Sequence, residues 1–136
     1  MAHETNPLLV VQSYIDAFNK GDVEAMSACF AEKASILDGM PPHVWHGSSA
    51  GRDWYADVLT EGEHLGAGDY VVTLGQPLHD DITGDAAYIV VPASMEFNVR
   101  GQPFKQTGAT FTVALRQVAG NWRIAAWAWA KGLAAT

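Results

Sequence analysis

Helical periodicity runs through the first part of the chain. Apolar side chains recur at helical spacing over residues 6–20, after an Asn-Pro start, and this pattern predicts a helix with Tyr14 near the middle of its apolar face. Gly21 is expected to end this helix, and Asp22 to cap a short second helix over residues 23–30. The opening of the chain therefore predicts a helical hairpin.

A short strand and a third helix follow. Residues 33–38 predict the strand, which the Gly-Met-Pro-Pro loop at 39–42 interrupts. Ser48 or Ser49 is expected to cap the third helix, whose apolar positions recur at helical spacing and place Tyr55 on the buried side.

From residue 69 onward the period changes from helical to two, which is typical of β-strands. The predicted strands are residues 70–78, 86–99, 103–118 and 122–130. The breaks between the last three, together with residues 81–85, are interpreted as hairpin turns. Three helices followed by a meander of antiparallel strands predict an α+β fold, in one domain over residues 1–136.

A curved antiparallel sheet with three helices has one face to cover and one left over. Phe111, Val113 and Leu115 share one face of their strand, and Trp127 and Trp129 share one face of the last. If the helices do not fill the concave face, a pocket remains, and the outer face, if apolar, favours a homodimer.

Composition narrows the partners. The chain is 49% hydrophobic and carries a net charge of -7 without a basic run, which argues against nucleic acid and anionic membranes and favours a small apolar ligand. The N-terminus has no signal-like pattern, so a cytoplasmic location is expected. The lone Cys29 cannot form an internal disulfide, and neither a metal nor a cofactor is expected.

Three polar residues on predicted apolar surfaces are the candidate chemistry: Tyr14, Asp38 and Tyr55. The two tyrosines also suit simple core packing, with each hydroxyl bonded to a neighbour. Asp38 also suits an Asp-Gly turn that ends a strand. Alternation along its strand favours a carboxylate that faces the pocket.

The chain resembles the nuclear-transport-factor-2-like superfamily of cone-shaped α+β barrels, which includes SnoaL-like proteins, and within it the ketosteroid isomerases. The segments that carry the resemblance are residues 11–15 (VQSYI), 19–22 (NKGD), 30–31 (FA), 34–38 (ASILD) and 52–56 (RDWYA). The second half of the chain resembles these proteins in strand pattern only.

The resemblance implies three roles. Tyr14 would donate a hydrogen bond to a substrate carbonyl, Asp38 would move a proton between neighbouring carbons, and Tyr55 would hydrogen-bond Tyr14. The residues expected to contact the substrate are Trp54, Thr107, Phe111, Val113, Trp129 and His46.

Two positions depart from the isomerases. Ala109 stands where they carry a protonated aspartic acid as a second donor, and Thr107, expected on the same strand face, is the candidate replacement. Gly39 stands where they usually carry proline, a change expected to re-aim the carboxylate of Asp38.

Three functions stay open at this point. The first is a cofactor-independent isomerase or lyase that acts on a small apolar ketone or enone. The second is a non-catalytic binding or assembly module on the same fold. The third is a polyketide-cyclase-like enzyme that keeps Asp38 and recruits His43 or His46.

Overall fold

The computed structural model describes residues 6–135, and its N-terminal part is the predicted helical hairpin. Helix α1 (Pro7–Lys20) begins at Asn6, whose side chain accepts a hydrogen bond from the Leu8 N–H, and ends at Gly21 in the left-handed conformation. Helix α2 (Val23–Ala28) is capped by Asp22, as predicted, through the Ala25 N–H.

Helix α3 (Ala50–Leu65) begins after Ser49 and ends at Gly66, which has a φ of 68°. Ser49 occupies the cap position, but its side chain makes no capping hydrogen bond. The predicted start of the helix is therefore confirmed, while the expected capping hydrogen bond from the serine hydroxyl is wrong.

The strands form one curved sheet, which does not close into a barrel. They are β1 (Phe30–Leu37), β2 (Val44–Gly47), β3 (Ala67–Leu74), β4 (His79–Thr83), β5 (Ala86–Val99), β6 (Gln102–Val118), β7 (Asn121–Ala130) and β8 (Leu133–Ala135). The order is β2-β1-β7-β6-β5-β3, with β4 beside β5 and β8 beside β6. Only β1 and β7 pair in parallel in the described part of the chain.

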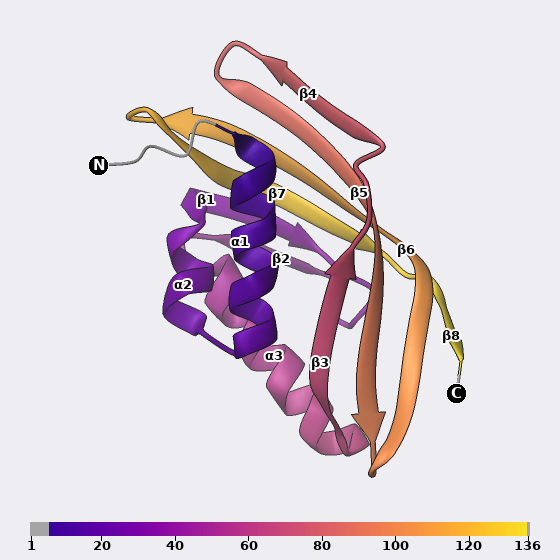
Figure 1. The fold of residues 1–136 in the computed structure, drawn as a ribbon. Helices are drawn as coiled ribbons and strands as arrows, with labels where there is room; N and C mark the ends of the chain where they lie inside the picture. Colours follow the sequence, from indigo (N-terminus) through magenta and orange to yellow (C-terminus); the bar gives the residue numbers. More distant parts are fainter. Residues whose placement is uncertain (1–5, 136) are drawn as a thin grey trace.

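Figure 1 shows the three helices on one side of the sheet, with the long strands β5 and β6 bending around them. This arrangement confirms the predicted α+β fold, a cone of three helices on a mostly antiparallel sheet. The inward faces of the strands pack on α1, and the predicted grouping of Phe111, Val113 and Leu115 is confirmed, since each is at most 1% exposed.

Three short strands escape the sequence prediction. The segment that became β2 follows two prolines and has only four residues, too few to show alternation. The β4 segment was assigned partly to a turn, and all of its residues are exposed, so no buried face marks it. The β8 strand has only three residues, and it pairs with β6, which lies far from it in sequence.

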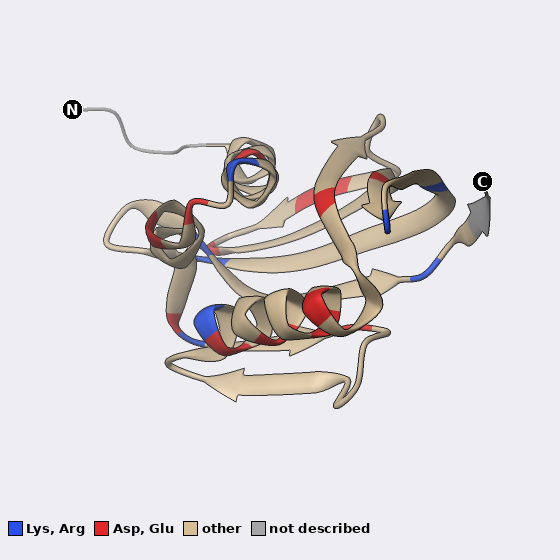
Figure 2. Cartoon of the chain, turned by 90° about the horizontal axis from the view of Figure 1, so that it is seen from below, with Lys and Arg blue, Asp and Glu red and all other residues tan. Residues whose placement is uncertain are grey.

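The outer face of the sheet carries apolar and small side chains in cross-strand rows. One row runs through Val44, Leu37, Ala128, Thr112 and Val90, each paired with the next. Leu37 and Val44 are more than half exposed. Figure 2 shows charged residues, most of them acidic, scattered over helices and strands, with no continuous basic stretch in the described residues. No helix in the described residues is long and apolar enough to cross a membrane.

Candidate functional site

A cavity of about 490 Å³ lies between the helices and the concave face of the sheet. This volume is in the range of small-molecule sites. Most of the wall is apolar or aromatic, and its polar side chains, tryptophans aside, are Tyr14, Asp38, Glu61, Tyr70, Gln106 and Lys131. The sequence-predicted residues Trp54, Phe111 and Trp129 also line it.

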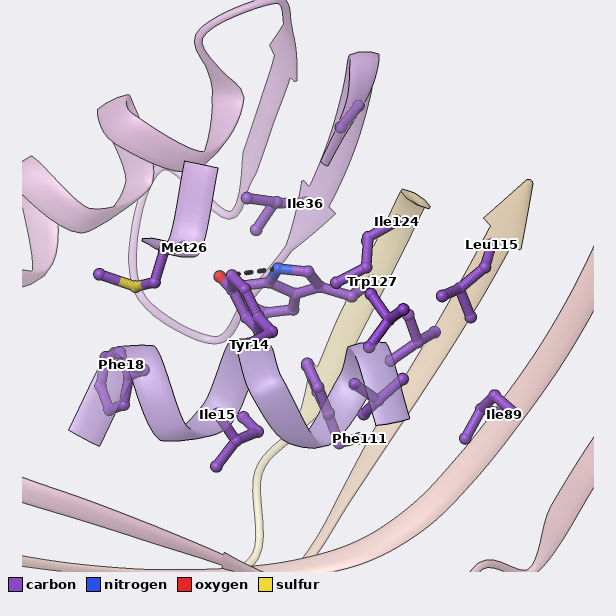
Figure 3. Close-up of a cluster of buried hydrophobic side chains, with 14 of the residues drawn as sticks. Tyr14, Ile15, Phe18, Met26, Ile36, Ile89, Phe111, Leu115, Ile124 and Trp127 are labelled. Carbon is purple, nitrogen blue, oxygen red and sulfur yellow. Dashed lines mark hydrogen bonds between the residues drawn. The ribbon is translucent and has the colours of Figure 1, made fainter. Parts of the chain in front are cut away.

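Tyr14 reaches this cavity from the middle of α1. It is only 2% exposed and packs edge-on against Phe30, with ring centroids 5.2 Å apart, and stacks with Phe111 at 6.3 Å. Its hydroxyl oxygen accepts a hydrogen bond of 3.1 Å from the Trp127 indole Nε1–H. Figure 3 shows this bond within a cluster of buried hydrophobic side chains. Because indole N–H can only donate, the tyrosine keeps its own hydrogen for another partner.

Burial raises the pKa of the Tyr14 hydroxyl far above its ordinary value of 10.0. The Trp127 hydrogen bond acts in the opposite direction, and the negative charges of Cys29 and Asp38, when ionised, add to the rise. Tyr14 is therefore a neutral hydrogen-bond donor throughout the neutral pH range.

Asp38 follows directly after β1, at the edge of the same cavity. One carboxylate oxygen, Oδ2, accepts a hydrogen bond of 2.9 Å from the Trp54 indole N–H. The other, Oδ1, accepts one of 2.8 Å from the backbone N–H of Gly39. Each oxygen has a second lone pair free, so the two bonds fix the carboxylate without using up its ability to accept a proton.

Gly39 explains how this loop holds the carboxylate. Its backbone N–H is the donor to Asp38 Oδ1, and proline at this position would have no N–H to give. The Lys131 side chain also lies where a side chain on Gly39 would be, because a Cβ there would come within 2.8 Å of three of its carbons. The departure at Gly39 thus creates a hydrogen bond as well as space.

Tyr55 does not hydrogen-bond Tyr14, and the role expected for it belongs to Trp127. Consecutive residues on a helix point about 100° apart. Trp54 takes the direction that faces the cavity, so Tyr55 turns toward the end of α1, where its ring meets Phe18 edge-on at 6.0 Å. It lines a second hollow of about 570 Å³ beside the C-terminal ends of α1 and α3.

A β-bulge in β6 turns Thr107, the predicted replacement donor, out of the cavity and turns Gln106 into it. Ala93 pairs with Ala109 and Met95 pairs with Gln106, so one residue of β5 faces both Thr107 and Gly108. Gly108 has a φ of 76°, a conformation that glycine adopts without strain. Thr107 consequently lies exposed outside the cavity wall, and Gln106 lines the cavity.

Gln106 is one of four polar wall residues that the sequence prediction missed, with Glu61, Tyr70 and Lys131. Its side-chain oxygen accepts a hydrogen bond of 3.3 Å from the Trp129 indole N–H. The available signal was Gly108, because an isolated glycine within a strand pattern indicates a bulge. Ala109 is 1% exposed in the core beside Ala93 and supplies no side-chain donor.

The other expected contact residues lie elsewhere. Val113 is fully buried in the core and does not line the cavity. His46 pairs with Ser35 on the outer face of the sheet, where its ring Nδ1 lies 2.7 Å from the serine hydroxyl. His43 is exposed and lies outside the wall, with Nδ1 3.1 Å from the Asp38 backbone carbonyl. The placement of His46 is wrong in the prediction because residues 44–47 form a strand, not a loop.

The described residues contain no group of three or more His, Cys, Asp or Glu side chains placed to hold a metal ion. The polar groups of the mainly apolar cavity wall, indoles aside, are two phenols, two carboxylates, one amide and one ammonium group.

The model of the SnoaL-like domain matches residues 9–128, which is most of the chain. The chain belongs to the SnoaL-like family. This SnoaL-like protein matches no curated protein in sequence.

Solved structures share its fold at low identity. A ketosteroid isomerase-like protein from Erwinia carotovora atroseptica SCRI1043 has a TM-score of 0.71 and 19% identity, over 90% of this chain and 91% of that chain. Hexachlorocyclohexane dehydrochlorinase LinA-type3 from Novosphingobium barchaimii LL02 has a TM-score of 0.79 and 10% identity, over 93% and 84%. An NTF2-like protein of unknown function from Pseudomonas putida KT2440 has a TM-score of 0.65 and 18% identity, over 92% and 89%. At these identities the likeness shows the fold alone.

Proposed function

We propose that this SnoaL-like protein is a cofactor-independent enzyme that moves a proton between carbons of a small, mainly apolar ketone or enone. The observation that carries the proposal is that one cavity contains both a neutral phenol donor, Tyr14, and a carboxylate, Asp38. Each is held by an indole N–H, from Trp127 and Trp54 respectively.

In the proposed reaction, the substrate carbonyl oxygen accepts a hydrogen bond from Tyr14. Asp38 removes a proton from the carbon beside the carbonyl, and the C–H electron pair moves toward the oxygen to form an enolate. The phenol donor stabilises the negative charge on that oxygen. The protonated Asp38 then returns the proton to a carbon further along the conjugated system, so the substrate is isomerised without gain or loss of atoms.

The fixed carboxylate suits this role. General bases work when they are held within reach of the proton they remove, and the two hydrogen bonds from Gly39 and Trp54 limit the rotation of the Asp38 carboxylate. The apolar wall favours substrates without many polar groups.

Ala109 supplies no oxyanion donor, and we expect this absence to lower the rate of the proposed reaction. Loss of one such donor typically costs about 10²–10³ in rate. We therefore expect slow turnover of simple steroid-like enones. A substrate whose enolate needs less stabilisation should be turned over faster.

The test compares enone isomerisation by the wild type and by Asp38→Asn, in which the amide keeps an oxygen for the Trp54 N–H but loses the base. Loss of general base catalysis should lower kcat by about 10²–10⁴-fold. The matched control is Asp57→Asn, because Asp57 accepts a similar 2.8 Å hydrogen bond from Trp45 outside the cavity wall. Equal rates in the wild type and Asp38→Asn would remove Asp38 as the base.

A binding module without turnover is the second candidate, and Ala109 is the observation that favours it. A steroid-like phenol should bind Tyr14→Phe more weakly if the phenol donor recognises the ligand oxygen. Unchanged affinity, together with no turnover by the wild type, would support the binding module. The histidine-dependent cyclase reading gains no support from the cavity, since neither His43 nor His46 lines it.

We also propose that two copies pair through the outer face of the sheet. The cross-strand row from Val44 to Val90 supports this, because Leu37 and Val44 are more than half exposed and Ala128 and Thr112 beside them are only part-buried. Sedimentation at micromolar concentration should give a dimer, and Leu37→Glu should give a monomer. A monomeric wild type would refute the pairing.

A further inference from the structure

The cavity has a second polar group apart from Tyr14 and Asp38. It consists of the Gln106 carboxamide and the Lys131 ammonium, both in the wall. Residues 131–132 lead into β8, which pairs with β6 through Leu133–Thr107 and Ala134–Gln106, so the chain at Lys131 runs beside the bulge that turns Gln106 inward. Gln106 therefore reaches the cavity from β6, and Lys131 reaches it from the connection between β7 and β8, which runs beside β6.

Trp129 fixes which way the Gln106 amide faces. The indole N–H can only donate, so the carbonyl oxygen of the amide must be the atom that it contacts, at 3.3 Å. The amide NH₂ group is then left with its two donors. In a mainly apolar wall, these donors favour an acceptor on the ligand.

Lys131 supplies a positive charge that no ion pair neutralises among the described residues. Its aliphatic carbons cover Gly39, because they occupy the place that a Cβ on this glycine would take. The side chain also lines the cavity. The ammonium lies more than 4.0 Å from the carboxylate of Asp38, because the structure records no salt bridge between them.

We propose that the ligand carries a carboxylate, which the Gln106 amide NH₂ and the Lys131 ammonium bind at the part of the cavity away from Tyr14. The substrate class is then an apolar keto acid or enone acid rather than a neutral ketone. This inference rests on the proposed function, which places the reacting carbonyl at Tyr14.

Spacing along the sheet separates the two ends of the ligand. Trp127 and Trp129 are two residues apart on β7, and Trp127 contacts Tyr14 while Trp129 contacts Gln106. Gln106 is also five residues from Phe111, which stacks on Tyr14. One ligand that reaches both Tyr14 and Gln106 therefore needs a carbonyl and a carboxylate that are separated by part of its apolar body.

The chemistry of the pair favours a carboxylate over other anions. One ammonium and one amide NH₂ match a single negative charge with two oxygens, whereas a phosphate dianion usually needs several charged donors. A cationic ligand would meet Lys131 and would need Glu61, which lines the wall beside Tyr70. An amine-bearing probe therefore shows whether Glu61 or Lys131 controls which ligand charge the cavity accepts.

The experiment measures binding without turnover, by quenching of tryptophan fluorescence. The probes are an apolar phenol with a carboxylate at its far end, its methyl ester and the corresponding amine. Lys131→Met keeps the stem that covers Gly39 and removes the charge. The control, Lys105→Met, removes the same charge next to Gln106 from an exposed side chain outside the cavity wall.

The wild type should bind the acid more tightly than the ester or the amine. Lys131→Met should weaken binding of the acid about 3- to 10-fold and leave the ester unchanged, the modest size being expected for an exposed ammonium. Lys105→Met should leave both within about twofold. Gln106→Leu should weaken the acid as well.

Three results would overturn the inference: equal binding of acid and ester by the wild type, tighter binding of the amine, or equal losses in Lys131→Met and Lys105→Met. Failure of the proposed function is separable, because it would appear as an Asp38→Asn variant with unchanged turnover. Binding of the acid through Lys131 can be measured whether or not the protein turns over.

Discussion

Replacing Tyr14 by phenylalanine removes one oxygen atom and tests both the structure and the chemistry of the cavity. The ring should keep its place, because Phe30, Phe111 and Trp127 surround it. The Trp127 N–H loses its acceptor at a residue that is only 4% exposed.

The expected loss of stability follows from that orphaned donor. A buried donor without a partner costs about 1–3 kcal/mol. For a chain of 136 residues, with an unfolding entropy of about 2.1 cal/mol/K per residue, this corresponds to a fall in Tm of roughly 3–10 °C. Calorimetry of the wild type and Tyr14→Phe measures it directly.

The expected loss of activity is separate. Without the phenol donor, kcat for enone isomerisation should fall by about 10²–10³-fold. Trp127→Phe provides the comparison: it breaks the same hydrogen bond but leaves the Tyr14 hydroxyl, so its kcat should fall less, although the smaller ring also leaves a cavity that costs stability.

The double variant Tyr14→Phe/Trp127→Phe isolates the bond. The stability losses of the two single changes should add to more than the loss of the double change, by about 1 kcal/mol, because both single changes break the same interaction. Additive stability losses, with an unchanged Tm in Tyr14→Phe, would refute the hydrogen bond. Equal rate losses in the two single variants would refute Tyr14 as the donor to substrate.

Three further predictions follow from the same cavity. Gly39→Pro removes the N–H that holds Asp38 and should lower kcat by about 10-fold or more, whereas Gly39→Ala keeps the N–H and should lower kcat less. Steady-state kinetics measures both variants, and equal losses of kcat would mean that the hydrogen bond is unimportant. Trp54→Phe frees the other carboxylate oxygen and should lower kcat with little change in KM, while a change in KM alone would make Trp54 only a binding surface. Because the fold raises the pKa of Tyr14 above its ordinary 10.0, the unfolded chain releases this proton first as pH rises. The stability contribution is therefore full below about pH 10 and falls above it by about 1.4 kcal/mol per pH unit, so urea unfolding of Tyr14→Phe should show a shallower loss between pH 10 and 11.

The strong periodic segments were predictable from the sequence. Helix α1 and strands β5, β6 and β7 lie where the apolar pattern places them, because burial of a continuous face determines both the pattern and the element. Tyr14 could be placed on the buried face of its helix, and Asp38 at the end of its strand, for the same reason.

The prediction of side-chain direction was wrong where the position of a single residue changes which way a side chain points. Tyr55 and Trp54 are neighbours on α3, and the sequence does not say which of them faces the cavity and which faces Phe18. In β6, the bulge at Gly108 exchanges Thr107 for Gln106, because one extra residue in a strand moves the next side chain to the other face.

The sequence by itself therefore determined the order of the elements, the inward faces of the main strands and the presence of a phenol and a carboxylate on apolar surfaces. Those properties follow from local periodicity and the cost of burying polar groups. Only the tertiary structure decided that Trp127 supports Tyr14, that Trp54 and Gly39 hold Asp38, and that Gln106 and Lys131 line the same cavity. These contacts join residues up to 113 positions apart, and they depend on strand register and helix rotation, which local pattern does not specify.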